Sequence, residues 1–424
     1  MKVLFACYPE RTHFLLMAPL AWALRTAGHD VRVASQPKFA ATITQAGLTA
    51  VPVGSDRDLW QVLGRIKKEG TTLEPGLPEP YDVVERKPED ITLDHLRDGY
   101  RSQVQNWLKM INVPLAGALI DYARHWKPDL VVWEPLTHAG ALAAQSVGAA
   151  HARLLIGADV HGVARHHFLR LGGGEDHGEG GADPLGEWLG GYARTYGREF
   201  DEELVTGQFG IDVLPPPLQV HAPDLSYLSM RYVPYGGPAV VPRWLWERPR
   251  RPRVALTLGL TVSDHGIGYP VGVQEILDAV ADLDIELVAT VGAAGRGRPV
   301  RVPDNTRLVD YVPMQALLPT CAAVIHHAGV GTLMTAALYG VPQIALPWDV
   351  DQPLLSGRLA AYGAGLTTHA TRATGDIVRD HLQRVLKDDE FGHRASRLRQ
   401  ETLGVPHPAD LVPELVNRVS AMRR

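Results

Sequence analysis

The sequence contains few of the residues that define several common classes of protein. Cysteine occurs only twice in 424 residues, at Cys7 and Cys321, which is too few for a disulfide framework or a cysteine zinc site. The apolar run at residues 3–7 is followed at once by Pro9, Glu10 and Arg11, so it is too short for a signal peptide. No apolar run reaches the roughly 18 residues that span a membrane. These absences predict a cytoplasmic protein with no membrane partner.

An excess of positive charge is also absent. The formal net charge is −5, whereas nucleic-acid-binding domains are usually basic. The glycine-rich tract 172–181 contains His177 and carboxylates that resemble metal ligands. Its glycines cannot hold those side chains in a fixed geometry, so the composition predicts a flexible loop. We therefore predict neither a nucleic-acid partner nor a metal site.

Two series of apolar strands alternate with helices along the chain. The first series has helices over 13–27, 38–46, 115–126, 139–146 and 183–204, and strands at 3–7, 30–35, 49–53, 129–133 and 151–156. The second has strands at 254–258, 286–291, 306–309, 323–325 and 343–346. This alternation is typical of parallel sheets covered by helices. It predicts an α/β protein with two Rossmann-like domains that face a central cleft.

Proline-rich stretches set the predicted domain boundaries. They give an N-terminal domain at 1–235, a linker at 236–252 and a C-terminal domain at 253–404, with a final segment at 405–424. Within the first domain, residues 54–112 interrupt the alternation and carry amphipathic pieces at 59–66 and 93–110. An insert of this length in a compact α/β unit is usually functional or mobile.

The most informative stretch is the turn at 326–332, which joins a buried strand to a helix. Gly329 and Gly331 let the backbone approach a ligand, and the N–H groups of the following helix attract an anion. His327 can add a donor, and Thr332 can cap the helix or bond a phosphate. The turn lacks the Walker pattern, and Met334 stands where a dinucleotide fingerprint has its third glycine. The turn therefore predicts a diphosphate site of another kind.

The sequence HHAGVGT, followed by GVPQIALPWDVDQP, resembles the donor-site signature of nucleotide-sugar glycosyltransferases of the GT-B fold. It is most similar to bacterial antibiotic glycosyltransferases that attach deoxysugars to macrolides and aromatic polyketides. One position departs from the pattern: Ala328 stands where that family usually has glycine. Because strand neighbours point to opposite sides, we expect His327, rather than His326, to face the phosphates.

The resemblance implies a set of donor-binding residues. Gly259 and Thr261 would contact the donor phosphates, and the backbone of Val312 would pair with the pyrimidine base. Sugar hydroxyls would bond to Asp351 and Gln352, while Trp348 lines the sugar pocket or belongs to the core. A TDP-sugar would be the co-substrate, with no metal and no further cofactor. Phosphate contacts are expected from His327, Gly329, Gly331 and Thr332.

On the acceptor side, His13 opens the first helix, where the family carries its acceptor-activating histidine. A neutral imidazole can take the proton of an acceptor hydroxyl as it attacks the sugar. Such a base needs an acidic neighbour to fix its tautomer. Glu134, after the strand at 129–133, and Asp159, after the next strand, are both candidates.

The predicted function is inverting, metal-independent transfer of a deoxysugar from a TDP-sugar to a polyketide or other natural-product aglycone. Two alternatives are a nucleotide-sugar-modifying enzyme of epimerase type and a non-catalytic nucleotide-sugar-binding protein. The residues do not distinguish bonds to oxygen, nitrogen or carbon.

Further partners follow from the insert and from the C-terminus. An amphipathic insert can pack on its own domain, form a homodimer or, as in similar macrolide transferases, bind a cytochrome-like helper protein. By resemblance to the GT-B fold, a C-terminal helix at 409–422 would return to the N-terminal domain.

Overall fold

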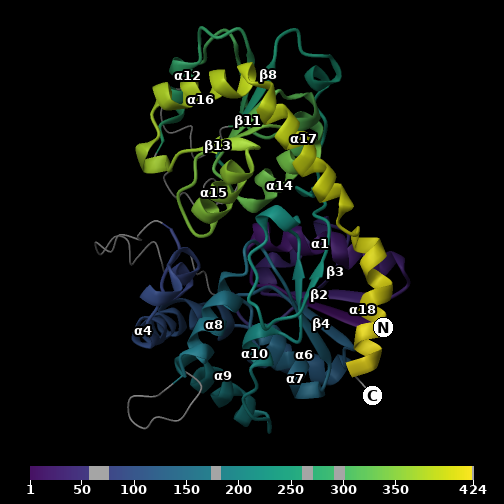
Figure 1. Cartoon of the computed structure of the whole chain (residues 1–424). Coiled ribbons are helices and arrows are strands. Elements are labelled where there is room, and N and C mark those ends of the chain that lie inside the picture. The colour runs from purple at the N-terminus through teal and green to yellow at the C-terminus, as the bar shows by residue number, and fades with distance from the viewer. Residues whose placement is uncertain (57–75, 173–182, 260–270, 291–300, 423–424) are drawn as a thin grey trace. The chain divides into compact units, whose positions relative to one another are not determined.

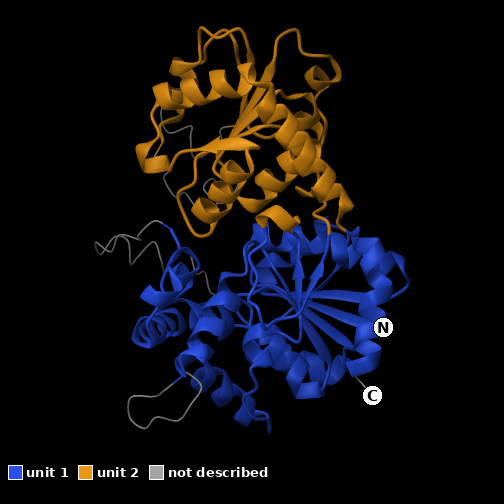
Figure 2. Cartoon of the chain, viewed as in Figure 1, with its two compact units in different colours: residues 1–213, 219–230, 406–424 blue, residues 214–218, 231–405 orange. Residues whose placement is uncertain are grey.

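The computed structural model describes residues 1–56, 76–172, 183–259, 271–290 and 301–422. The chain divides into two compact units (Figure 2). Unit 1 contains residues 1–213, 219–230 and 406–424, and unit 2 contains residues 214–218 and 231–405. Residues 236–252, predicted as a linker, lie within unit 2. Residues 59–66, most of the 172–181 tract and Thr261 lie outside the described residues.

Unit 1 is built on a parallel sheet with the strand order β3-β2-β1-β4-β5-β6-β7. Strand β4 is buried along its whole length, and β1 along all but its first residue, because helices cover both faces of such a sheet. The strands are β1 Lys2–Ala6, β2 Asp30–Ser35, β3 Thr49–Pro52, β4 Leu130–Trp133, β5 Ala150–Leu154, β6 Gly210–Asp212 and β7 Tyr227–Ser229. The apolar runs thus predicted the central strands, while the short β6 and β7 were not predicted.

Helices surround this sheet (Figure 1). They are α1 Arg11–Thr26, α2 Ala40–Gln45, α4 Leu93–Gln103, α5 Lys109–Asn112, α6 Ala116–Trp126, α7 Ala139–Val147, α8 Val160–Arg170, α9 Pro184–Thr195, α10 Glu203–Thr206 and α18 Pro408–Met422. Helix α18, yellow in Figure 1, packs against α1. The last helix of the chain therefore belongs to unit 1, with Leu411, Val412 and Leu415 buried.

The single helix predicted over 183–204 is wrong. Helix α9 ends at Thr195, and helical structure resumes only at Glu203. Between them Gly197 has a φ of 75°, a left-handed conformation that ends helices and that glycine adopts without steric cost. The apolar spacing continued across a break that one glycine determines.

The described part of the insert packs on unit 1 itself. Helix α4 is followed without interruption by a π-helical turn, η4 Val104–Leu108, and by α5. On α4, Leu96 and Tyr100 are buried, and the helix contacts α8 and α9. The short 3-10 helices η2 Tyr81–Glu85 and η3 Pro88–Asp90 precede it, and η2 packs against α8. The apolar stripe of α4 is thus covered by the chain's own helices.

Unit 2 repeats the arrangement with the strand order β10-β9-β8-β11-β12-β13, again all parallel. Its strands are β8 Arg253–Thr257, β9 Glu286–Thr290, β10 Thr306–Val309, β11 Ala323–His326, β12 Gln343–Ala345 and β13 Gly365–Thr367. Its helices are α12 Val273–Ala279, α13 Met314–Leu317, α14 Val330–Tyr339, α15 Gln352–Tyr362, α16 Gly375–Lys387 and α17 Asp389–Gly404. The predicted class, α/β with two Rossmann-like sheets, is confirmed. Among the described residues, no helix is both long enough and apolar enough to cross a membrane.

Candidate active site

Each sheet has one point where the strand order reverses. In unit 1 this point lies between β1 and β4, and in unit 2 between β8 and β11. Open parallel sheets bind their ligands at the carboxyl ends of the strands at such a switch point. The loops after these four strands carry His13, Glu134, Gly259 and His327. Two equivalent places in the two units therefore hold the predicted site residues.

His13 and Glu134 meet at the switch point of unit 1. His13 lies in the first turn of α1, whose N-cap residue Glu10 accepts the N–H of Thr12 at 3.2 Å. Its Nδ1 lies 3.2 Å from Oε2 of Glu134. The Glu134 side chain is fully buried, whereas 15% of the His13 side chain is exposed. The pair thus joins an inaccessible carboxylate to a partly accessible imidazole.

Glu134 is held by its own loop as well as by His13. Its Oε2 accepts the N–H of Leu136 at 3.0 Å, and its Oε1 accepts the hydroxyl of Thr137. The Thr137 oxygen in turn accepts the backbone N–H of Tyr8 at 2.9 Å. These bonds tie the loop after β1 to the loop after β4, so the carboxylate has a fixed position relative to His13.

Asn112 anchors the same loop from the end of α5. This residue is fully buried. Its amide oxygen accepts the N–H of Ala139 at 2.8 Å, and its amide nitrogen donates to the carbonyls of Leu136 and Leu108, each at 2.9 Å. Sequence reasoning missed Asn112, because a polar residue at the end of an insert gives no local sign of a partner 24 positions later.

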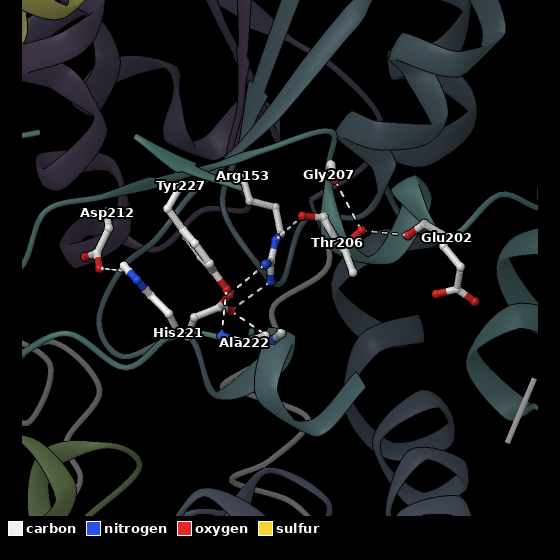
Figure 3. A network of polar contacts seen from close by, with 10 residues as sticks. Arg153, Glu202, Thr206, Gly207, Asp212, His221, Ala222 and Tyr227 are labelled. Carbon is white, nitrogen blue, oxygen red and sulfur yellow. Dashed lines mark hydrogen bonds and ion pairs between the residues drawn. The ribbon is translucent and has the colours of Figure 1, made fainter. Parts of the chain in front are cut away.

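Asp159, the other candidate partner of His13, has different partners. Its oxygens accept from both terminal nitrogens of Arg153 at 3.0 and 2.8 Å, from the Tyr227 hydroxyl at 2.6 Å and from the N–H of Gly162 at 2.9 Å. Burial alone raises the pKa of Asp159, but the Arg153 charge and these hydrogen bonds hold it below the ordinary value. Figure 3 shows Arg153 and Tyr227 in this network. The geometry thus pairs His13 with Glu134.

His327 of unit 2 lies between two glycines from the loops after β8 and β11. A Cβ at Gly259 would lie 2.4 Å from the His327 ring, and one at Gly329 would lie 2.3 Å from its Nε2. Both positions therefore require glycine for the ring to stay in place. Burial lowers the pKa of His327 to about 4, and its Nδ1 has no hydrogen-bond partner within the described residues. A neutral imidazole with an unsatisfied nitrogen thus lies beside the start of α14.

His326 differs from its neighbour. Its side chain is fully buried at the end of β11, and its Nδ1 accepts the backbone N–H of Ala328 at 3.0 Å. Ala328 itself is fully buried and has a φ of 67°, the left-handed region that disfavours any side chain. The alanine at this glycine position therefore keeps the loop conformation with local strain.

Helix α14 begins within the turn that the sequence predicts at 326–332. It runs from Val330, and its N-cap residue is Gly329, with no side-chain cap. Thr332 therefore cannot cap the helix, because it lies inside the first turn; its N–H bonds to the carbonyl of Gly329 at 3.1 Å. Gly331 is exposed beside it. The α14 N-terminus thus presents backbone N–H groups in a glycine-lined turn.

The loop 348–352 bends back on itself through Gln352. The Gln352 amide oxygen accepts the N–H groups of Trp348 at 3.1 Å and Asp349 at 3.3 Å, which leaves the amide NH₂ group on the other side. Val350 has a φ of 51°, an outlier for a β-branched residue. Asp351 is the N-cap residue of α15. The fold thus sets Asp351 and Gln352 side by side at a helix start.

Two predicted donor residues lie in the core. Val312 is 1% exposed and belongs to a hydrophobic cluster with Val288 and Leu317, so only its backbone is available to a base. Trp348 is partly buried and packs against a second cluster of unit 2. The core interpretation of Trp348 therefore accounts for much of its surface.

Comparison with known proteins gives the family. Residues 22–259 match the model described as "Erythromycin biosynthesis protein CIII-like, N-terminal domain", and residues 274–418 match that of the C-terminal domain. The chain is 45% identical to 10-deoxymethynolide desosaminyltransferase of Streptomyces venezuelae, over 100% of this chain and 98% of the relative. It is 41% identical to aclacinomycin-T 2-deoxy-L-fucose transferase of Streptomyces galilaeus, over 100% and 97%.

A solved structure agrees in fold over the whole chain. Glycosyltransferase VinC in complex with dTDP matches with a TM-score of 0.87 and 39% identity, over 99% of this chain and 100% of that chain. The two sheets and this match define a GT-B glycosyltransferase fold, as predicted. The chain belongs to the erythromycin biosynthesis protein CIII-like family. The predicted likeness to antibiotic deoxysugar glycosyltransferases is confirmed.

Proposed function

We propose that this protein transfers a deoxysugar from a TDP-sugar to a polyketide aglycone, with inversion at the anomeric carbon. The observation that carries the proposal is the pair of His13 and Glu134 at the switch point of unit 1. Nδ1 of His13 lies 3.2 Å from Oε2 of Glu134. Relatives whose names describe desosaminyl and 2-deoxy-L-fucose transfer supply the substrate class. A non-catalytic binding protein would have no use for a base at this position, and the names of these relatives describe sugar transfer rather than epimerisation.

In the proposed reaction His13 acts as the general base. Glu134 holds the Nδ1 proton, so Nε2 takes the proton from the acceptor hydroxyl. The hydroxyl oxygen forms a bond to the anomeric carbon as the bond from that carbon to the diphosphate oxygen breaks. The electron pair leaves with TDP, and attack from the opposite face inverts the configuration. The buried Glu134 carboxylate stabilises the imidazolium that forms.

In unit 2 the donor would be held mainly by backbone groups. The N-terminus of α14, with Gly329, Gly331 and Thr332 in its first turns, binds the diphosphate, and the His327 ring adds a polar contact. The amide NH₂ group of Gln352 and the carboxylate of Asp351 would bond sugar hydroxyls. These groups offset the charge of the leaving diphosphate without a metal. Full activity in EDTA would support metal independence, and its loss with recovery on Mg²⁺ would contradict it.

The central test is the variant His13→Ala. Loss of a general base typically lowers turnover by ~10²–10⁴-fold, so transfer to an ordinary hydroxyl should fall by that factor. Calorimetric titration with TDP should give an unchanged affinity, because the proposed TDP contacts lie in unit 2. Arg11→Ala, a change of an α1 residue two positions before His13, serves as the control and should retain turnover. Near-normal turnover of His13→Ala would contradict the base assignment.

The need for partners is part of the same proposal. The apolar residues Leu96 and Tyr100 of α4 are covered by α8 and α9, which favours an insert that packs on its own unit over one that requires a helper or a second copy. We therefore expect the purified chain to turn over alone, at a rate per chain independent of its concentration. A rate that appears only on addition of a cytochrome-like protein, or that rises with dimer formation, would contradict this expectation.

A further inference from the structure

A second histidine–carboxylate pair lies in unit 1, away from the switch point. Nε2 of His221 lies 2.7 Å from Oδ2 of Asp212 (Figure 3). Asp212 is the last residue of β6, and its side chain is 1% exposed, whereas that of His221 is 30% exposed. Since all strands of this sheet are parallel, the pair lies on the same carboxyl edge as His13 and Glu134.

The ring of His221 is held rigidly in place. It stacks on the ring of Tyr227, with centroids 3.8 Å apart and planes 6° from parallel. The Tyr227 hydroxyl in turn donates to the buried Asp159 at 2.6 Å and accepts the N–H of Ala222 at 3.0 Å. Arg153 completes this framework through its ion pair with Asp159 and a 2.6 Å bond to the carbonyl of Thr206. A partly exposed imidazole is thus fixed by a half-buried tyrosine, which the buried Asp159 and Arg153 hold in turn.

The pairing determines what the exposed side of the ring can recognise. An ionised carboxylate only accepts hydrogen bonds, so Asp212 fixes the proton of the neutral ring on Nε2 of His221. Nδ1 then carries a lone pair, and no described residue donates a hydrogen bond to it. The nitrogen is therefore suited to accept a hydrogen bond from a hydroxyl group of a ligand, rather than to bond a carbonyl oxygen.

The strand order gives the separation of the two pairs. From β1 the sheet proceeds through β4 and β5 to β6, and neighbouring strands lie about 4.8 Å apart. The two pairs are therefore roughly 10–15 Å apart along one edge, by this spacing. A polyketide aglycone of several fused or linked rings is long enough to reach from one to the other.

We propose that His221, held by Asp212 and Tyr227, is a specificity-determining residue that accepts a hydrogen bond from an aglycone hydroxyl remote from the one that receives the sugar. This inference rests on the proposed function, in that the aglycone is the ligand of unit 1. It adds a second polar anchor, which selects aglycones by a hydroxyl at a given distance from the reacting one and fixes their orientation.

Direct binding tests the inference without turnover. Macrolactone and anthracyclinone aglycones are titrated into the whole protein, each alongside derivatives in which one remote hydroxyl is oxidised to a ketone. One neutral hydrogen bond changes affinity by up to about tenfold, so we expect wild type to bind one parent about tenfold more tightly than its ketone. His221→Ala should bind both alike, and at the weaker level. His221→Lys, which offers Asp212 a donor but has no acceptor atom, keeps the buried carboxylate paired if His221→Ala fails to fold, and should likewise lose the preference for the hydroxyl.

The matched control is His166→Ala. His166 also bonds an aspartate, Asp224, at 2.7 Å, but that carboxylate is 78% exposed. This variant should keep the wild-type preference for the hydroxyl. A turnover assay then separates the two hypotheses: selective binding without sugar transfer would contradict the proposed function alone. Equal loss of parent and ketone affinity in His221→Lys, an unchanged preference in it, or wild-type binding of no aglycone would overturn the role of His221.

Discussion

The two switch points occupy equivalent places in two similar sheets, but they are built differently. In unit 1 the polar groups satisfy one another: His13 bonds Glu134, and Thr137 and Asn112 hold the loop around them. In unit 2 His327 has an unsatisfied buried nitrogen, and Ala328 has a left-handed backbone. The switch point of unit 1 is thus organised by its own hydrogen bonds, whereas that of unit 2 retains unsatisfied polar atoms and strain.

This difference follows from the chemistry that we propose for each unit. A base must have a fixed tautomer and position, so unit 1 surrounds it with hydrogen-bonded side chains. A diphosphate brings its own acceptor oxygens and charge, so unit 2 can leave N–H groups at the start of α14 for it to satisfy. The same kind of change made in both units therefore tests this contrast.

The largest expected effect is a loss of stability in acid. Burial lowers the pKa of His138 and His151 to about 4 and that of His161 to about 3 in unit 1, and lowers those of His326 and His327 in unit 2. Between pH 6.5 and these values the unfolded chain binds protons that the folded chain does not. The contribution of these histidines to the free energy of unfolding is therefore fully present above pH 6.5. It is lost as the pH falls below 6.5, by about 1.4 kcal/mol per pH unit for each such histidine.

Urea unfolding between pH 7.5 and pH 5 measures this effect. His161, which packs on Tyr81 with ring centroids 4.2 Å apart, can be replaced by phenylalanine, and His161→Phe should reduce the slope by about one histidine's share. Tyr81→Phe, which changes the other ring of the same contact without removing an imidazole, is the control and should leave the slope unchanged. A stability that does not vary over this range would contradict the burial of these imidazoles as neutral groups.

Next in size is the effect of His327 on turnover. Loss of one group that stabilises developing charge typically costs ~10²–10³-fold in turnover, so we expect His327→Ala to fall in that range. Gly329→Ala should act through the same ring, because its Cβ would lie 2.3 Å from Nε2 of His327. Gly357→Ala, where nothing lies within 4 Å of a new Cβ, is the control. Turnover of His327→Ala within a few-fold of wild type would assign the ring a structural role.

Removal of the Asn112 side chain should have a smaller effect, on stability. Asn112→Ala leaves the N–H of Ala139 and the carbonyl of Leu136 without their partner, which costs about 1–3 kcal/mol. Urea denaturation measures the loss, and turnover should fall with it because the Glu134 loop loses its anchor. Asn106→Ala is the matched control, since within the described part of the chain that amide bonds the Ser102 hydroxyl at an exposed site. Equal effects of the two changes would show that unit 1 does not depend on this anchor.

The smallest expected effect comes from Ala328→Gly. A left-handed residue with a side chain costs roughly 1–2 kcal/mol, and the greater freedom of glycine in the unfolded chain offsets part of the gain. We expect the variant to be more stable by up to about 1 kcal/mol, as measured by the urea midpoint, with TDP affinity retained. Ala337→Gly, at a buried position inside α14, should be destabilising instead. If Ala328→Gly also destabilised the protein, the strain assigned to unit 2 would be wrong.

The fold class and most of the strands could be predicted from the sequence alone. Runs such as residues 3–7 and 129–133 are apolar because both faces of a parallel sheet are buried, and that signal is local. The turn around His327 was also predictable, because its glycines and the following helix are contiguous. Where the local signal was incomplete, the predictions were wrong or missing, as at the break near Gly197 and at the short strands β6 and β7.

Which side chains meet could not be read from the sequence and depends on the tertiary structure. Glu134 and Asp159 both follow strands, and the sequence left them equal as partners of His13; the strand order β1-β4-β5 brings Glu134 to His13 and gives Asp159 to Arg153. Asn112 and the pair of His221 and Asp212 were not predicted at all. The physical reason is that strand and helix periodicity depends on neighbours in the chain, whereas the pairing of distant side chains depends on strand order and on the paths of the loops.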